Sequence, residues 1–147
     1  MSPGLQAKLL RVLETRRFRR VGGRDERLAD FRVLAATNRD PEQAVSQGRL
    51  RDDLYYRLNV FHVTVPPLRD RPEDIAPLAA RFVAGFAEQN GRAVEGLSNE
   101  ALSALEAYDW PGNVRQLRNA IERAVVLARG PVLDLTDLPS RSRAQWW

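Results

Sequence analysis

Arginine is the most abundant chemically functional side chain in this 147-residue sequence, and it makes up 22 of the 23 basic residues. There is no cysteine and His62 is the single histidine, which excludes thiol chemistry and disfavours a histidine metal site or a serine–histidine triad. Lys8 is the one lysine among 23 basic residues. Guanidinium groups suit bidentate contacts with phosphate or carboxylate, but the codon bias of an arginine-rich genome is the favoured general explanation of the excess. We expect no metal ligands.

Two of these arginines, Arg51 and Arg57, lie six residues apart in a stretch expected to form a short helix over 51–58. At this spacing they are about 240° apart around the axis. A guanidinium fixed at a subunit edge can stabilise charge on a phosphate bound by the neighbouring subunit. The alternative is a solvated basic face beside Asp52 and Asp53.

Thr37 and Asn38 come directly after an apolar run, and their short polar side chains could hydrogen-bond an attacking water or a phosphate oxygen. This reading depends on the run being a strand, because ligands bind at the carboxyl ends of strands in α/β sheets. Alternatively, Asn38 is simply a turn former.

Arg115 follows Trp110-Pro111-Gly112-Asn113, and we place it in the first turn of a helix capped by Asn113 and Gln116. From the residues alone, it could form an ion pair with Glu106 or Glu122.

The elements that position these residues show α/β patterning up to a double proline, Pro66-Pro67. We predict a helix over 5–16, buried strands over about 31–37 and 60–65, and a loop over 24–30. Asp40 and Pro41 are typical of a helix start. Beyond the prolines the pattern becomes helical, with helices expected over 72–89, from Ser98 to about 108, and from Asn113 onward.

Five ordered segments resemble one family closely: 5–13 (LQAKLLRVL), 36–40 (ATNRD), 51–60 (RDDLYYRLNV), 67–71 (PLRDR) and 109–117 (DWPGNVRQL). Over residues 2–139 the chain resembles the C-terminal part of the AAA+ ATPase domain of bacterial enhancer-binding proteins. These are sigma-54-dependent transcriptional activators, many of them two-component response regulators.

The resemblance implies a partial AAA+ P-loop-type sheet in residues 1–68, a helical lid in 69–139 and a tail in 140–147. It implies that Thr37 and Asn38 are the sensor I residues. Arg51 and Arg57 would be arginine fingers acting in trans, and Arg115 would be the sensor II arginine of the lid.

The sequence contains no G-x-x-x-x-G-K-[ST] loop and no strand ending in paired acids, which the family uses to hold phosphate and Mg²⁺. We therefore expect ATP and Mg in the intact parent domain, and neither nucleotide binding nor hydrolysis by this chain alone. The resemblance implies a homo-oligomeric AAA+ ring as partner. It also implies that sigma-54 RNA polymerase is a partner of the parent protein, contacted through regions outside this chain.

Two other functions stay open at this point. The chain could be a non-enzymatic module that joins or poisons activator rings, or, less favoured, a basic helical DNA-binding domain. Arginines are densest over 16–27, which we interpret as a subunit interface or solvated face rather than a nucleic-acid patch. No direct DNA binding, no membrane association and a cytoplasmic location are expected.

Overall fold

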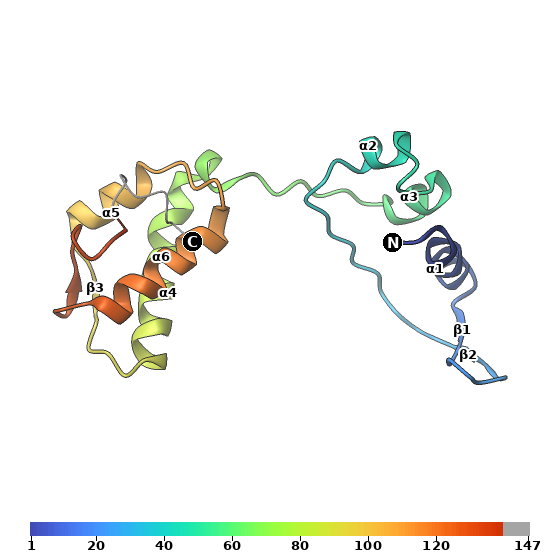
Figure 1. Cartoon of the computed structure of the whole chain (residues 1–147), viewed down its shortest axis with the longest axis horizontal. Helices are drawn as coiled ribbons and strands as arrows, with labels where there is room; N and C mark the ends of the chain where they lie inside the picture. Colours follow the sequence, from blue (N-terminus) through green and yellow to red (C-terminus); the bar gives the residue numbers. More distant parts are fainter. Residues whose placement is uncertain (140–147) are drawn as a thin grey trace. The chain divides into compact units, whose positions relative to one another are not determined.

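The computed structural model describes residues 1–139 and divides into two compact units, Met1–Thr64 and Val65 onward (Figure 1). The tail expected over 140–147 lies outside the described residues. Each unit has its own buried side chains and is described by itself.

The first unit is built on helix α1 (Pro3–Thr15) and helix α3 (Asp52–Leu58), which pack against each other. Pro3 suits the first position of α1 because its missing N–H would be unpaired there anyway. Leu13 on α1 and Leu54 on α3 are buried. Helix α2 (Pro41–Ser46) begins as predicted, with the Asp40 carboxylate accepting hydrogen bonds from the Glu42 and Gln43 amides.

Strands β1 (Arg17–Arg19) and β2 (Glu26–Leu28) form an antiparallel hairpin directly after α1. The turn closes where the Gly23 amide donates to the Arg20 carbonyl at 2.9 Å, and Gly22 has a φ of 77°, which glycine adopts without strain. The prediction of a loop over 24–30 is therefore wrong for residues 26–28. A charged strand of three residues carries no hydrophobic alternation by which it could be recognised.

The prediction of two strands over about 31–37 and 60–65 is also wrong, because neither run belongs to a β-ladder within the described residues. A strand needs a neighbour with which to exchange backbone hydrogen bonds, and no described segment supplies one to either run. Several of their apolar side chains are accordingly exposed, among them Leu34, Val60 and Phe61.

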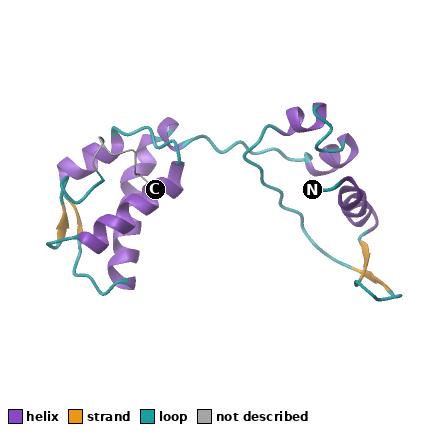
Figure 2. Ribbon diagram, viewed as in Figure 1, coloured by secondary structure: helices purple, strands orange, loops and turns teal. Residues whose placement is uncertain are grey.

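The second unit is helical, with two short parallel strands at one side (Figure 2). Helices α4 (Ile75–Gln89) and α6 (Asn113–Leu127) make its main contact, and α5 (Asn99–Glu106) packs on α4. The 3₁₀ turns η1 (Leu68–Asp70) and η2 (Pro72–Asp74) lead into α4, and β3 (Gly96–Leu97) pairs with β4 (Val132–Leu133). The core is apolar and includes Ile75, Val83, Leu105, Trp110, Leu117, Ile121 and Val125.

The break before α6 is a tightly constrained turn anchored by one buried side chain. Trp110 is fully buried at a φ of 48°, and its indole N–H donates to the Leu105 carbonyl at 2.8 Å. A Cβ on Gly112 would lie 2.8 Å from the Cβ of Gln116, so only glycine fits there without a shift. The Gln116 side-chain oxygen in turn accepts from the Gly112 amide at 2.9 Å.

Asn113 does not cap α6 as predicted, because Gly112 occupies the cap position. Its side-chain oxygen instead accepts a hydrogen bond from the Leu68 amide at 2.8 Å. The local pattern suggested a cap, but a partner 45 residues away in sequence has taken the asparagine oxygen.

Candidate functional site

Arg51 stands immediately before α3, and its guanidinium is held by the carboxylate of Asp53. Nε donates to Oδ1 at 3.0 Å and Nη2 to Oδ2 at 2.7 Å, a bidentate arrangement. The hydrogen bond from Arg51 lowers the pKa of Asp53, and the same bond raises the pKa of Arg51. Both side chains are substantially exposed, so the guanidinium is held by a carboxylate that another anion could replace.

Gln6 on α1 fixes the backbone from which Arg51 projects. It is 2% exposed, and its side-chain oxygen accepts from the Arg51 amide at 2.9 Å. Its side-chain nitrogen donates to the carbonyls of Arg49 at 3.0 Å and Met1 at 3.2 Å. We did not single out Gln6 from the sequence, although it stands seven residues before Leu13 on the buried side of α1.

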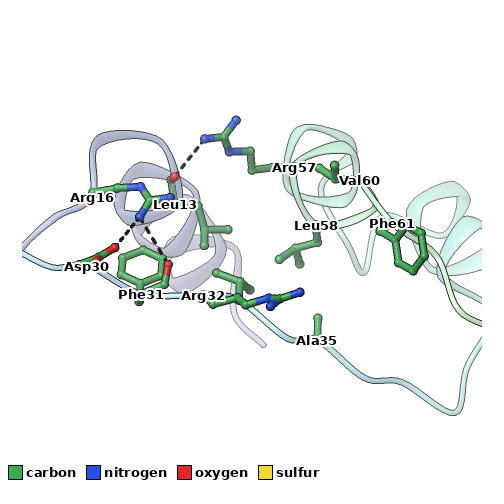
Figure 3. Close-up of a pocket in the computed structure, with 11 residues that line it drawn as sticks. Leu13, Arg16, Asp30, Phe31, Arg32, Ala35, Arg57, Leu58, Val60 and Phe61 are labelled. Atoms are coloured by element: carbon green, nitrogen blue, oxygen red, sulfur yellow. Dashed lines mark hydrogen bonds and ion pairs between the residues drawn. The ribbon is translucent and has the colours of Figure 1, made fainter.

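Arg57 has a different partner from Arg51. Its Nη2 donates to the Leu13 carbonyl at 3.1 Å, in the last turn of α1, where helix carbonyls lack intrahelical partners (Figure 3). The structure therefore does not bring Arg51 and Arg57 to one shared contact.

Arg57 also lines a hollow of about 700 Å³ in the first unit, together with Arg16, Phe31, Arg32 and Phe61 (Figure 3). Arg16 is oriented there by Asp30, at 3.1 Å, and lies over the Phe31 ring, 5.6 Å from its centroid. Guanidinium groups line the hollow beside apolar side chains from the two runs predicted as strands, over 31–37 and 60–65.

Thr37 and Asn38 lie in exposed irregular backbone before α2 and not after a strand, so the described structure supplies no strand end for them and their proposed roles rest on the family resemblance. The Thr37 hydroxyl accepts from the Arg39 amide at 3.0 Å and donates to the Arg39 carbonyl at 3.3 Å, which closes a local turn. The Asn38 side chain makes no hydrogen bond to any residue the structure describes, so its amide is available to a ligand.

Arg115 lies in the first turn of α6 and is exposed. The alternative ion pair with Glu122 is not formed, since Glu122 lies 3.5 Å from Arg118, which also stacks over the Phe86 ring. Nor does Glu106 pair with Arg115 anywhere in the described chain. A cation in the first turn opposes the helix dipole, so Arg115 gains most from an anionic ligand.

Arg92 has a structural role that the sequence did not indicate. Its Nη2 donates to the carbonyls of Val126 at 2.8 Å and Ala128 at 2.7 Å, at the C-terminal end of α6. It therefore satisfies carbonyls that the helix itself leaves unpaired.

Among residues 1–139, no three histidine, cysteine, aspartate or glutamate side chains gather in a way that could hold a metal ion. The same range contains no helix long and apolar enough to cross a membrane.

A small α/β-type unit followed by a helical lid is the arrangement of an AAA+ protein, and comparison with known proteins agrees. Residues 69–145 match the AAA+ ATPase lid domain, and residues 1–64 match the Sigma-54 interaction domain. The chain belongs to the AAA+ family of sigma-54-dependent transcriptional activators, and it represents part of their AAA+ domain. The resemblance drawn from the five sequence segments is confirmed.

Curated relatives include the nitrogen fixation protein AnfA of Azotobacter vinelandii and the regulatory protein AtoC of Escherichia coli K12. They are 52% and 50% identical to this chain over 139 residues, which is 95% of this chain but 26% and 30% of their own lengths. The chain therefore spans less than a third of these relatives.

Among solved structures, NtrX from Brucella abortus in complex with ATP is similar, with a TM-score of 0.83 and 39% identity. The match covers 95% of this chain and 32% of that one, and the same protein was also crystallised with ADP. This likeness confirms the predicted α/β class with its lid-like helical part.

Proposed function

We propose that this chain supplies the sensor, arginine-finger and lid portion of an ATPase that remodels sigma-54 RNA polymerase. Arg51 is the first arginine finger, directed at a phosphate held by a neighbouring subunit. Arg57 is the second, Thr37 and Asn38 are the sensor I pair, and Arg115 is the sensor II residue acting on the nucleotide of its own subunit. The domain limits proposed are 1–68 for the α/β part and 69–139 for the lid.

One observation carries this proposal furthest: Arg51 is held ready for an anion, on a backbone fixed by buried Gln6. Preorganised guanidinium groups stabilise the charge that develops on a transferring phosphoryl group without reorganising during the reaction. In this scheme Asp53 holds the guanidinium until a nucleotide phosphate from the neighbour competes for it. Arg57 uses one of its five N–H donors on the Leu13 carbonyl, which leaves others for the same phosphate.

The remaining components follow the same logic. The open amide of Asn38 orients the attacking water, and Arg115 folds onto the nucleotide with the lid. ATP and Mg²⁺ act in the intact parent domain, whose other segments supply the phosphate-binding loop and the acidic metal ligands. Within the sequence of this chain those motifs are absent, so we propose that it neither binds nor hydrolyses ATP alone.

Mixing this chain with intact AtoC of Escherichia coli and measuring ATP hydrolysis tests the assignment. If this chain enters the AtoC ring without a nucleotide site of its own, the rate of ATP hydrolysis should fall. Its Arg51 would still contact the nucleotide of one neighbouring subunit. R51A should therefore lower the rate further. R115A is the matched control: it should behave like the unmodified chain, because Arg115 acts only on a nucleotide that this chain does not hold.

Two results would refute the proposal. Either the unmodified chain leaves the AtoC rate unchanged at excess, or R115A alters the rate as strongly as R51A does. Micromolar binding of a fluorescent ATP analogue by the purified chain would independently refute the statement that it binds no nucleotide alone.

A further inference from the structure

The hairpin after α1 carries the whole formal charge of the protein. Residues 16–28, here called the basic hairpin, contain six arginines and two acidic residues, a net charge of +4. That equals the formal charge of the entire chain, because the other 17 basic residues are matched by 17 acidic ones. The positive charge is therefore concentrated in 13 residues rather than spread over the surface.

The register of the β1–β2 ladder places its three arginines on two opposite faces. Arg17 and Arg19 lie on one face with Glu26, each 3.4 Å from its carboxylate, which Arg11 also approaches at 3.9 Å. On the other face Arg27 stands opposite Phe18 across the strands. One face is thus partly neutralised and the other is not.

Three arginines stay without an anionic partner: Arg20 and Arg24 beside the turn, and Arg27 on the Phe18 face. All three are exposed, and none forms an ion pair with an acidic residue of the described range. Like charges within one short hairpin repel one another, and an external polyanion would relieve the repulsion. The other three arginines pair with only two acidic residues, Asp30 and Glu26, so they add to the positive potential of the hairpin.

We propose that the basic hairpin binds the phosphate backbone of duplex DNA, which replaces the subunit interface or solvated face expected from the sequence. A two-stranded ribbon fits the major groove, which is about 12 Å wide, and arginine suits phosphate oxygens geometrically. Binding to single strands needs several aromatic side chains for base stacking, and Phe18 is the one aromatic residue in the hairpin. The scarcity of aromatic side chains therefore favours a duplex, contacted by Arg20, Arg24 and Arg27.

The test compares two triple variants of the full chain with the same net charge, +1. R20Q/R24Q/R27Q removes the unpaired hairpin arginines. R81Q/R123Q/R129Q removes three exposed arginines of the second unit, none of which forms an ion pair in the described structure. Binding is measured by fluorescence anisotropy with a labelled 20-base-pair duplex and with one of its strands, over a series of salt concentrations, after circular dichroism has verified folding.

The hairpin triple variant should lose about tenfold or more in affinity at low salt. The slope of log K against log salt concentration should fall in magnitude by about 2.7, since each of the three lost phosphate contacts contributes about 0.9. The control triple should retain the slope of the unmodified chain. Equal losses in both variants, no duplex binding by the unmodified chain, or tighter binding to the single strand would each overturn the proposal.

A second measurement needs no variant. Hydrogen–deuterium exchange of the unmodified chain, with and without the duplex, should show protection of peptides covering residues 16–28. Protection confined to the second unit would place the DNA elsewhere and overturn the assignment to the hairpin.

Discussion

The side-chain oxygen of Asn113 accepts a hydrogen bond from the backbone amide of Leu68 at 2.8 Å. This contact ties the start of α6, the helix that carries Arg115, to the 3₁₀ turn that leads into the lid. Asn113 has a φ of 51°, a conformation that asparagine tolerates better than most residues. The identity of this residue therefore serves the backbone and the long-range contact together.

Replacing Asn113 with alanine should destabilise the start of α6 by about 1–3 kcal/mol, because the Leu68 amide loses its partner in a partly buried site. Hydrogen–deuterium exchange of peptides from η1 and α6 measures this as faster opening. N113D keeps an acceptor oxygen and should retain most of the protection. Equal exchange in N113A and the unmodified chain would show that the bond contributes nothing.

Replacing Gly112 with alanine should destabilise the lid by about 1–3 kcal/mol, since the new Cβ would meet the Gln116 Cβ at 2.8 Å. Gly85 is the matched control: it lies in α4, exposed, with nothing within 4 Å of an added Cβ. G85A should instead stabilise the protein by about 0.5–1 kcal/mol through helix propensity. Thermal unfolding monitored by circular dichroism should show opposite shifts, and a common direction would refute the steric argument.

Replacing Arg92 with alanine should weaken the C-terminal end of α6, because the Val126 and Ala128 carbonyls lose a charged donor. We expect a cost of about 1.5–3 kcal/mol, as for other hydrogen bonds to charged groups. R129A removes a nearby exposed arginine with no ion pair in the described chain and should change little. The readout is urea unfolding of the second unit, and similar midpoints for the two variants would contradict the capping role.

The Arg51–Asp53 pair should depend on pH in the acid range. Its hydrogen bond to Arg51 lowers the pKa of Asp53 from the ordinary value near 3.8, so the pair is intact above that value and is lost as pH falls through the lowered pKa. Carbon-detected NMR of the Asp53 carboxyl gives the midpoint directly. In R51A that midpoint should rise toward 3.8, and an unchanged midpoint would mean that Arg51 does not hold Asp53 in solution.

Local signals predicted the helical part of the fold well. The helix starts at Asp40 and Ser98 are confirmed, with both side chains accepting hydrogen bonds from amides of the following turn. These features depend on contacts two or three residues apart, which a single sequence displays directly. The family, likewise, could be identified from five short segments because their order and spacing stand in the sequence itself.

The sequence by itself determined the family, the helical lid and the identity of the arginines available for phosphate. Tertiary structure alone decided the long-range contacts of these arginines: the Arg51 backbone is fixed by Gln6, and Arg57 is bound to the Leu13 carbonyl. It also decided that the runs over 31–37 and 60–65 pair with no described neighbour, despite their strand-like composition. The physical reason is the same in each case. Propensity and caps act within a few residues, whereas a β-ladder or a hydrogen bond between two helices depends on which groups distant in sequence lie beside it.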